Sequence, residues 1–272
     1  MPYALESKKE FERLEHQSTL PKYDYKKELA ELKLKENAKV LDAGSGSGVV
    51  SRYIAQKNPS AKVIGCDMSQ DRVTLANEAA AHLSNVSFER ADLTKLRFES
   101  NTFDAIVCRY VLEHLTPKVR SEALIEMFRC LKPGGALYAI DFDGPLFNVF
   151  PQTDLITETL RLLEKSQLID LQIGRKMPHL LHQTGFENPS WRIETIECSG
   201  ESLKQERKLW PEKLETAAAL FAQILGSKRK ALQFNKEFLE TLARPDVVLF
   251  YNKFTVIGQK PSKKSKLKLV KD

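Results

Sequence analysis

Short apolar strands alternate with helical segments through the first half of the chain, and this alternation constrains the fold more than any other feature. Five strands are expected, the first ending at residue 41 and the others at 61–67, 86–92, 103–110 and 136–143. The helices expected among them cover 49–57, 69–83 and 119–135. Strands separated by such helices form a doubly wound parallel sheet. Ligands bind these sheets at the carboxyl ends of the strands, so the residues that end each strand are the candidate site.

A glycine-rich turn follows the first strand in the segment AKVLDAGSGSG. Gly44, Gly46 and Gly48 would let backbone amides approach a ligand at the start of the next helix. Many nucleotide-binding folds share such a turn, but the dinucleotide fingerprint has a further glycine where this chain has Val49. Asp42 would repel a pyrophosphate and attract a ligand that carries amino and sulfonium cations. The turn therefore favours a cationic ligand over a dinucleotide.

An acidic residue ends each of the next two strands. Asp67 lies where a carboxylate can accept hydrogen bonds from both hydroxyls of a ribose. Asp92 lies where a carboxylate can accept from an adenine amino group. Each has a simpler interpretation as well, Asp67 as an acid at the start of the helix 69–83 and Asp92 as a turn residue. The succession of glycine turn, acid and acid at three strand ends is more specific than any one of them.

These segments together resemble the class I S-adenosylmethionine-dependent methyltransferases. VLDAGSGSG is similar to the first motif of that family, VIGCD to its ribose-binding acid and FERADL to its adenine-contacting motif. FDAIVCRYVLEHL and LKPGGALYAID are similar to its fourth and fifth strands. The resemblance is close over 38–143 and greatest to small-molecule enzymes such as the ubiquinone-biosynthesis C-methyltransferases. It implies a Rossmann-like α/β sheet of seven strands in the order 3-2-1-4-5-7-6, whose last two strands form an antiparallel hairpin.

The resemblance also implies which residues bind S-adenosylmethionine. The expected contacts of the methionine part are Asp42, Gly44, Ser45, Gly46, Gly48 and Arg109. The expected contacts of the ribose and adenine are Asp67, Met68, Arg72, Asp92 and Leu93. Among these, Asp67 would hold the ribose and Met68 would pack on the adenine face.

The methyl acceptor would lie beyond the fourth and fifth strands. Methyl transfer is an in-line displacement in which the enzyme mainly positions the acceptor, and a base is needed only where the acceptor must lose a proton. The candidate bases at these strand ends are Tyr110, Glu113, His114, Asp141 and Asp143. His114 is preferred because imidazole titrates near neutral pH, although a His at this position can simply cap or pack. Tyr25, Tyr110 and Asp143 are expected to bind the acceptor, and no metal is expected.

The second half of the chain indicates a helical cap. Helices are expected at 153–167 and 177–189, and strands at 191–199 and 247–260. Residues 201–243 form a long helical stretch with breaks near Pro211 and Gly226. We expect a lid segment at 1–37, a methyltransferase domain at 38–260 with the cap at 201–243, and a basic, disordered tail at 261–272. The alternative for lid and cap is simple packing of amphipathic helices on the outer faces of the sheet.

Charge is concentrated at the end of the chain. The segment after Gln259 holds six lysines and one aspartate, so it carries +5 of the net charge of +6. The nearly neutral body favours a small-molecule acceptor and disfavours nucleic acid, as does CRYVLEH where amino-directed nucleic-acid methyltransferases carry an Asn/Asp-Pro-Pro-Tyr motif. A nucleic-acid or protein methyltransferase that docks through the tail is the second hypothesis, and a non-catalytic cofactor-binding regulator is the third.

Two further features bear on the location of the protein. No apolar run reaches the roughly 20 residues that span a bilayer, and the charged N-terminus does not resemble a secretory signal. The four cysteines are widely spaced, which is typical of reduced thiols in the cytoplasm. We therefore expect a cytoplasmic protein without a membrane span.

Overall fold

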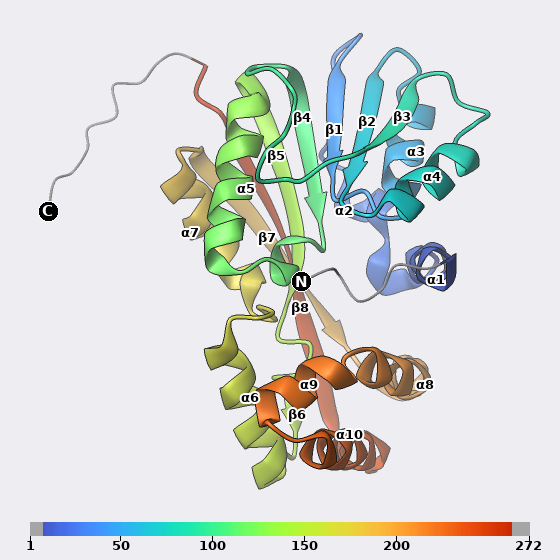
Figure 1. Cartoon of the computed structure of the whole chain (residues 1–272), viewed down its shortest axis with the longest axis vertical. Coiled ribbons are helices and arrows are strands. Elements are labelled where there is room, and N and C mark those ends of the chain that lie inside the picture. Colours follow the sequence, from blue (N-terminus) through green and yellow to red (C-terminus); the bar gives the residue numbers. More distant parts are fainter. Residues whose placement is uncertain (1–7, 263–272) are drawn as a thin grey trace, which may run out of the picture.

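The computed structural model describes residues 8–262, which form one mixed sheet with helices around it (Figure 1). Strands β1 to β5 run parallel, and β8 is antiparallel to both of its long neighbours. In spatial order the strands are β3 (Val86–Arg90), β2 (Lys62–Asp67), β1 (Lys39–Ala43), β4 (Phe103–Arg109), β5 (Leu131–Asp143), β8 (Val248–Gln259) and β7 (Glu187–Glu197). A two-residue strand, β6 (Val149–Phe150), pairs with the start of β8.

The predicted strand order is confirmed. When the short β6 is set aside, β7 is the sixth strand and β8 the seventh, so the order is 3-2-1-4-5-7-6. The last two form the expected antiparallel hairpin, with Trp191 opposite Val256 and Ile196 opposite Tyr251. Since β1 to β4 are parallel, their carboxyl ends meet at one edge.

Helices cover both faces of the sheet because successive residues of a strand point to opposite sides. Leu41 of β1 lies in the core that α5 and α7 share, whereas Val40 packs with residues of α3 on the other face. A fourth helix, α4, packs around Phe88 of β3. The bounds are α3 (Val49–Lys57), α4 (Gln70–Ala79), α5 (Pro117–Cys130) and α7 (Ile173–Thr184). The expected N-cap of α4 is present, since Ser69 Oγ accepts from Arg72 N at 3.3 Å.

Two predicted boundaries are wrong. The helix expected to run to residue 135 ends at Cys130, and the Lys-Pro-Gly-Gly sequence begins β5 instead. A proline disfavours helical backbone in the residue before it, which here is Lys132. Pro211 was expected to break the cap, but it lies inside α8 (Gly200–Thr216), where buried Trp210 and Leu214 hold the helix on both sides. The breaks fall at Ala217 and Gly226.

A second layer, made of helices, surrounds the amino-terminal end of β8 in the lower part of Figure 1. It contains α6 (Asp154–Ser166), α8, α9 (Ala218–Leu225) and α10 (Lys228–Ala243). Its apolar core includes Trp210, Phe221, Phe234 and Phe238. Figure 1 shows that the carboxyl ends of β1 and β4 face this layer. No helix among residues 8–262 has the length and apolar character needed to cross a membrane.

The N-terminal segment lies along the same edge of the sheet. It contains α1 (Lys8–Ser18), the 3-10 turn η1 (Pro21–Tyr23) and α2 (Tyr25–Glu28). Leu14 of α1 faces the glycine turn, and Glu15 pairs with Arg52 of α3 at 2.8 Å. The basic tail predicted at 261–272 lies outside the described residues from 263 onward.

Candidate functional site

One cavity joins the strand ends to the helical layer. Its volume is about 590 Å³, within the range of about 300–1,000 Å³ that ligand pockets occupy. One end is lined by the glycine turn and by the residues that end β1, β2 and β3; the other is lined by α8 and α9. Residues of α1, among them Leu14 and Gln17, line the space between. The cavity therefore lies on the edge of the sheet that was predicted.

The glycine turn lines the first end and is tightly packed from behind. Gly44 and Gly46 both have left-handed backbones, with φ of +78° and +55°. A Cβ on Gly44 would lie 2.4 Å from Val111 Cγ2, so only glycine fits there. Within the described residues, the buried hydroxyls of Ser45 and Ser47 have no hydrogen-bond partner. A buried hydroxyl without a partner is costly, which suits a polar ligand at this end.

Gly48 is not among the residues that line the cavity, and its contact with the methionine part stays a prediction. A Cβ at this position would lie 2.5 Å from the ring of Phe88 and 3.1 Å from Ala76 Cβ. Gly48 is therefore required for the close approach of α3, α4 and β3. The sequence pattern could not separate this packing role from ligand contact, because both favour glycine.

Asp67 combines the two interpretations that its sequence position allowed. Its Oδ1 accepts from Ser69 N at 2.9 Å and from Arg72 at 2.8 Å, as an acid at a helix start would. Its Oδ2 accepts from Gly46 N at 3.0 Å and so ties the glycine turn to β2. Oδ1 also accepts from Arg72 Nε at 3.1 Å, so Oδ2, whose one donor among the described residues is Gly46 N, is the oxygen that keeps capacity for a ligand. Arg72 lines the cavity too, and its ion pair orients Asp67.

Asp42 lines the cavity while it is almost fully buried. Burial raises the pKa of this carboxyl to about 6, although the hydrogen bond that Ser51 Oγ donates at 2.6 Å lowers it. The charge of Arg109 acts in the same direction as the Ser51 hydrogen bond. A carboxyl with this pKa can carry a negative charge beside the glycine turn at neutral pH.

The ends of β2 and β3 supply the remaining predicted cofactor residues, and Met68, Asp92 and Leu93 all line the cavity. Asp92 Oδ1 accepts from both the amide and the hydroxyl of Thr94 at 2.8 Å, so it also stabilises a turn. The Met68 side chain is 53% exposed, an unusual position for a large apolar group unless a ligand covers it.

Arg109 and Tyr110 belong to a buried cluster, hereafter the Glu28 cluster, with Glu28 and Lys253. Glu28 accepts an ion-paired hydrogen bond from Arg109 and a hydrogen bond from Tyr110 Oη at 2.8 Å, and its Oε1 lies 3.0 Å from Lys253 Nζ in an ion pair. Burial raises the pKa of Tyr110 well above its ordinary value, so this phenol stays protonated. Tyr110 also has φ of +55°, a strained backbone of the kind that often occurs at functional sites.

Glu28 and Lys253 were not predicted from the sequence. Glu28 lies in a single-turn helix, and Lys253 alternates with apolar residues as a surface lysine would. The available signal was the position of Lys253 in the apolar strand VVLFYNKFTVIG, where a buried lysine needs a carboxylate partner.

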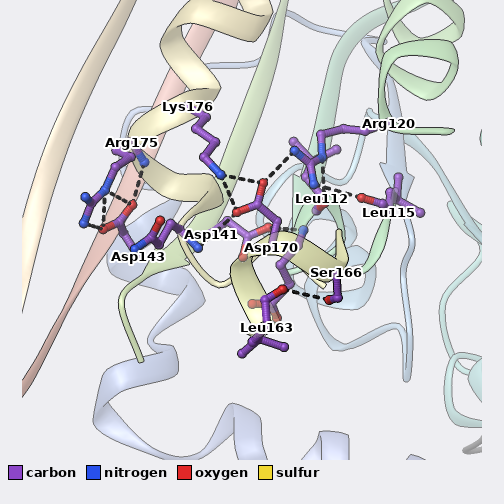
Figure 2. Close-up of polar contacts among 12 residues, drawn as sticks. Leu112, Leu115, Arg120, Asp141, Asp143, Leu163, Ser166, Asp170, Arg175 and Lys176 are labelled. Atoms are coloured by element: carbon purple, nitrogen blue, oxygen red, sulfur yellow. Dashed lines mark hydrogen bonds and ion pairs between the residues drawn. The ribbon is translucent and has the colours of Figure 1, made fainter. Parts of the chain in front are cut away.

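Two predicted acceptor-binding residues do not line the cavity. The Tyr25 ring packs edge-on against Tyr53, with centroids 5.2 Å apart. Asp143 is buried and accepts from Arg175 of α7 at 2.5–2.9 Å (Figure 2). Asp141 is fully buried as well, and burial together with Glu113 raises its pKa well above the ordinary value. Of the three residues predicted to bind the acceptor, only Tyr110 reaches the cavity.

His114 lines the cavity and lies in the 3-10 turn η2 (Leu112–His114). Its side chain is about one third exposed, and its Nε2 lies 3.3 Å from Glu113 Oε1. Glu113 also lines the cavity. Imidazole is the side chain most often used as a general base, and the approach of Glu113 can orient its ring.

The second end of the cavity is an apolar wall. Its members come from β5 and its following loop, α6, the loop after α6, and the cap: Phe142, Leu146, Leu163, Ile169, Leu171, Trp210 and Phe221. Trp210 Nε1 is buried and has no partner among the described residues, and Lys213 Nζ lies 4.7 Å above the Trp210 ring. The helices α8 and α9 of the predicted cap thus line the cavity. No group of three or more metal-ligating side chains is present in the described part of the chain.

Comparison with known proteins covers part of the chain. A family model described as methyltransferase domain matches residues 40–135. A phosphoethanolamine N-methyltransferase of Plasmodium falciparum is 35% identical over 117 residues, 43% of this chain and 44% of the relative. A ubiquinone/menaquinone biosynthesis C-methyltransferase of Geotalea daltonii is 30% identical over 123 residues, 44% of this chain and 52% of the relative. The chain therefore spans about half the length of the curated relatives it matches.

A solved structure covers more of the chain. Phosphoethanolamine N-methyltransferase 2 of Haemonchus contortus, in complex with phosphomonomethylethanolamine and S-adenosylhomocysteine, has a TM-score of 0.56 and 22% identity. The likeness covers 88% of this chain and 54% of that one, and it shows the fold. The matched sequence segment holds the glycine turn and the acids that end β2 and β3. Residues 40–135 therefore match a methyltransferase domain, and the strand order is that of the Rossmann-like fold of the class I S-adenosylmethionine-dependent methyltransferases.

Proposed function

We propose that this protein transfers a methyl group from S-adenosylmethionine to a small, mainly apolar molecule. The observation that carries the proposal is the single cavity that runs from the acidic strand ends to the apolar wall. A methyltransferase must hold two ligands with their reacting atoms adjacent, and a continuous cavity with two chemically different ends provides for this.

The first end fits the cofactor. Asp67 would accept from the ribose, Asp92 from the adenine, and Ser45 and Ser47 would satisfy their hydroxyls on the methionine part. Asp42 would attract the cationic groups. When bound, S-adenosylmethionine supplies an electrophilic methyl group. The chain contributes orientation and the exclusion of water, because the cofactor end lies between α1 and the sheet edge.

The apolar wall supports the choice of acceptor. Its side chains offer area for a hydrophobic body, and His114, Glu113 and Tyr110 are polar groups of the same cavity. An acceptor with an apolar body and one reactive hydroxyl or amino group would place that group near His114. We propose His114 as the base, with Glu113 orienting its ring. The names of the two relatives suggest acceptors of opposite polarity, and the wall favours the quinone-like class over the phosphorylated amine.

Incubation of a lipid and metabolite extract with methyl-labelled S-adenosylmethionine tests this proposal. The full chain should label small molecules that partition into an organic solvent, and mass spectrometry should find a gain of one methyl group. His114→Gln should slow the labelling while cofactor binding persists. Label found only in water-soluble amines, or only in protein or nucleic acid, would contradict the proposed acceptor class.

A further inference from the structure

The turn that carries Glu113 and His114 is held through its backbone by buried charged side chains from other elements. Arg120 of α5, which is 4% exposed, donates Nε to Leu112 O at 3.1 Å and Nη2 to Leu115 O at 2.8 Å. These two carbonyls flank Glu113 and His114 on either side. Figure 2 shows the guanidinium reaching both of them.

The same guanidinium is fixed by an acid outside the turn. Arg120 Nη1 donates to Asp170 Oδ2 at 2.9 Å, and Lys176 Nζ lies 2.8 Å from Asp170 Oδ1 (Figure 2). The backbone of Asp170 contacts the turn directly, since its N–H donates to Glu113 O at 2.8 Å. On the other side, Asp141 Oδ2 accepts from Glu113 N at 3.3 Å.

Asp170 also belongs to the loop that forms part of the apolar wall. Its neighbours in sequence, Ile169 and Leu171, both line the cavity. Leu171 O accepts from Gly144 N at 2.7 Å, which ties this loop to the end of β5. Asp170, which holds Arg120, and two members of the apolar wall, Ile169 and Leu171, therefore belong to one short segment.

We propose that Arg120 and Asp170 form a positioning pair that fixes His114 relative to the apolar wall. The inference rests on the proposed function, in which His114 acts on an acceptor held by that wall. Neither member of the pair lines the cavity, so its role would be to set the distance between the base and the acceptor. A change of about 1 Å in that distance is enough to slow a reaction that depends on alignment.

The chain offers a matched control on the same helix. Arg129 of α5 makes the same type of clamp: it donates to Leu96 O at 2.9 Å and to Phe98 O at 2.8 Å, and pairs with Glu126 at 2.8 Å. The loop that it holds does not line the cavity. Arg129→Gln and Arg120→Gln therefore each remove a clamp on two backbone carbonyls. Only the clamp made by Arg120 holds the turn that carries His114.

Hydrogen exchange and histidine NMR on the full-length chain test the proposal. In Arg120→Gln, amide exchange should accelerate about tenfold or more in both 112–115 and 168–172. In Arg129→Gln it should accelerate at 95–99 and change less than about twofold in the other two segments. The ring Cε1–H resonance of His114, assigned with His114→Gln, should shift or broaden in Arg120→Gln only. Asp170→Asn, which nearly keeps the side-chain shape, should move the same resonance in the same direction.

Calorimetry with S-adenosylhomocysteine separates this inference from the proposed function. Arg120→Gln should bind this ligand within about threefold of the wild-type affinity, because the cofactor end of the cavity is untouched. No binding to the wild-type protein would contradict the proposed function itself. Binding with an unchanged His114 resonance in both Arg120→Gln and Asp170→Asn would overturn the positioning pair alone, as would equal acceleration of 112–115 in the Arg129→Gln control.

Discussion

Asp42 shows how one buried carboxylate couples the fold to its ligand. Burial raises its pKa from 3.8 to about 6, so the folded protein binds this proton more tightly than the unfolded chain does. The buried charge therefore costs stability as the pH rises from about 4 to about 6. The same charge, at the glycine turn, is the one expected to attract a cationic ligand. The site thus carries an electrostatic cost that a bound cofactor would offset.

Asp42→Asn should remove this cost. Relative to the wild type, the free energy of unfolding of the variant should rise by about 2 kcal/mol between pH 4 and pH 7, as measured by urea unfolding across that range. Asp104→Asn is the control. Burial alone would raise the pKa of Asp104, but the hydrogen bond from Lys132 brings it below the ordinary value of 3.8. The difference in unfolding free energy between Asp104→Asn and the wild type should therefore stay flat from pH 5 to pH 7. If the difference in unfolding free energy between Asp42→Asn and the wild type did not depend on pH, burial would not raise the pKa of Asp42.

Gly46→Val should abolish cofactor binding and leave most of the fold. A Cβ there would lie 3.2 Å from Leu14 Cδ1, in the space between α1 and the turn, on a backbone with φ of +55°. Gly226→Val is a matched control, because its φ is +63° and nothing lies within 4 Å of the added Cβ. Both variants should lose about 1–2 kcal/mol of stability from the left-handed backbone. Calorimetry should show loss of binding for Gly46→Val only; equal binding by the two would make the turn purely structural.

At the scale of elements, the two covers of the cavity differ in how they are attached. Helix α1 lies over the glycine turn and is linked to the body by the Glu15–Arg52 ion pair and by contacts with α4. Helices α8 and α9 belong to a large apolar core with α6 and α10. The N-terminal cover is thus the easier to displace, and the cap is the more rigid of the two walls.

Cofactor binding should protect α1 most strongly. We expect slower hydrogen exchange over 11–18 and over 42–48, with a smaller change in 200–217, when S-adenosylmethionine is added to the full chain. Mobile covers exclude water from a transfer site once ligands are bound. Protection confined to 42–48, 67 and 92 would show instead that the site is open and that α1 only packs on the sheet.

The elements also show where sequence reasoning succeeds and where it stops. The parallel strands and the acids at their ends follow from local patterns, because hydrophobic periodicity and strand-end chemistry are local properties. The direction of a side chain depends on packing that is not local. Asp143 was predicted to face the acceptor, yet Arg175, thirty-two residues away, holds it against α7. Glu28 likewise acquires its role only when β8 brings Lys253 beside it.

At the scale of the whole molecule, the cavity lies between two layers of different construction. The sheet supplies acids and backbone at fixed strand ends, and the helical layer supplies apolar side chains. The family model matches part of the sheet half, from residue 40 to 135, and none of the helical layer. The helical layer, which forms most of the apolar wall, is therefore the part in which acceptor choice would differ among members of the family.

Calorimetric titration of the full chain with S-adenosylmethionine tests the central claim most directly. The wild type should bind one equivalent, and Asp67→Ala should bind about 10- to 150-fold more weakly, since a hydrogen bond to a charged group contributes about 1.5–3 kcal/mol. Asp104→Ala removes a carboxylate that also accepts a backbone amide and an ion pair, but at the opposite edge of the sheet, and it should bind as the wild type does. Absence of binding to the wild type, or equal affinities for the wild type and Asp67→Ala, would contradict the account.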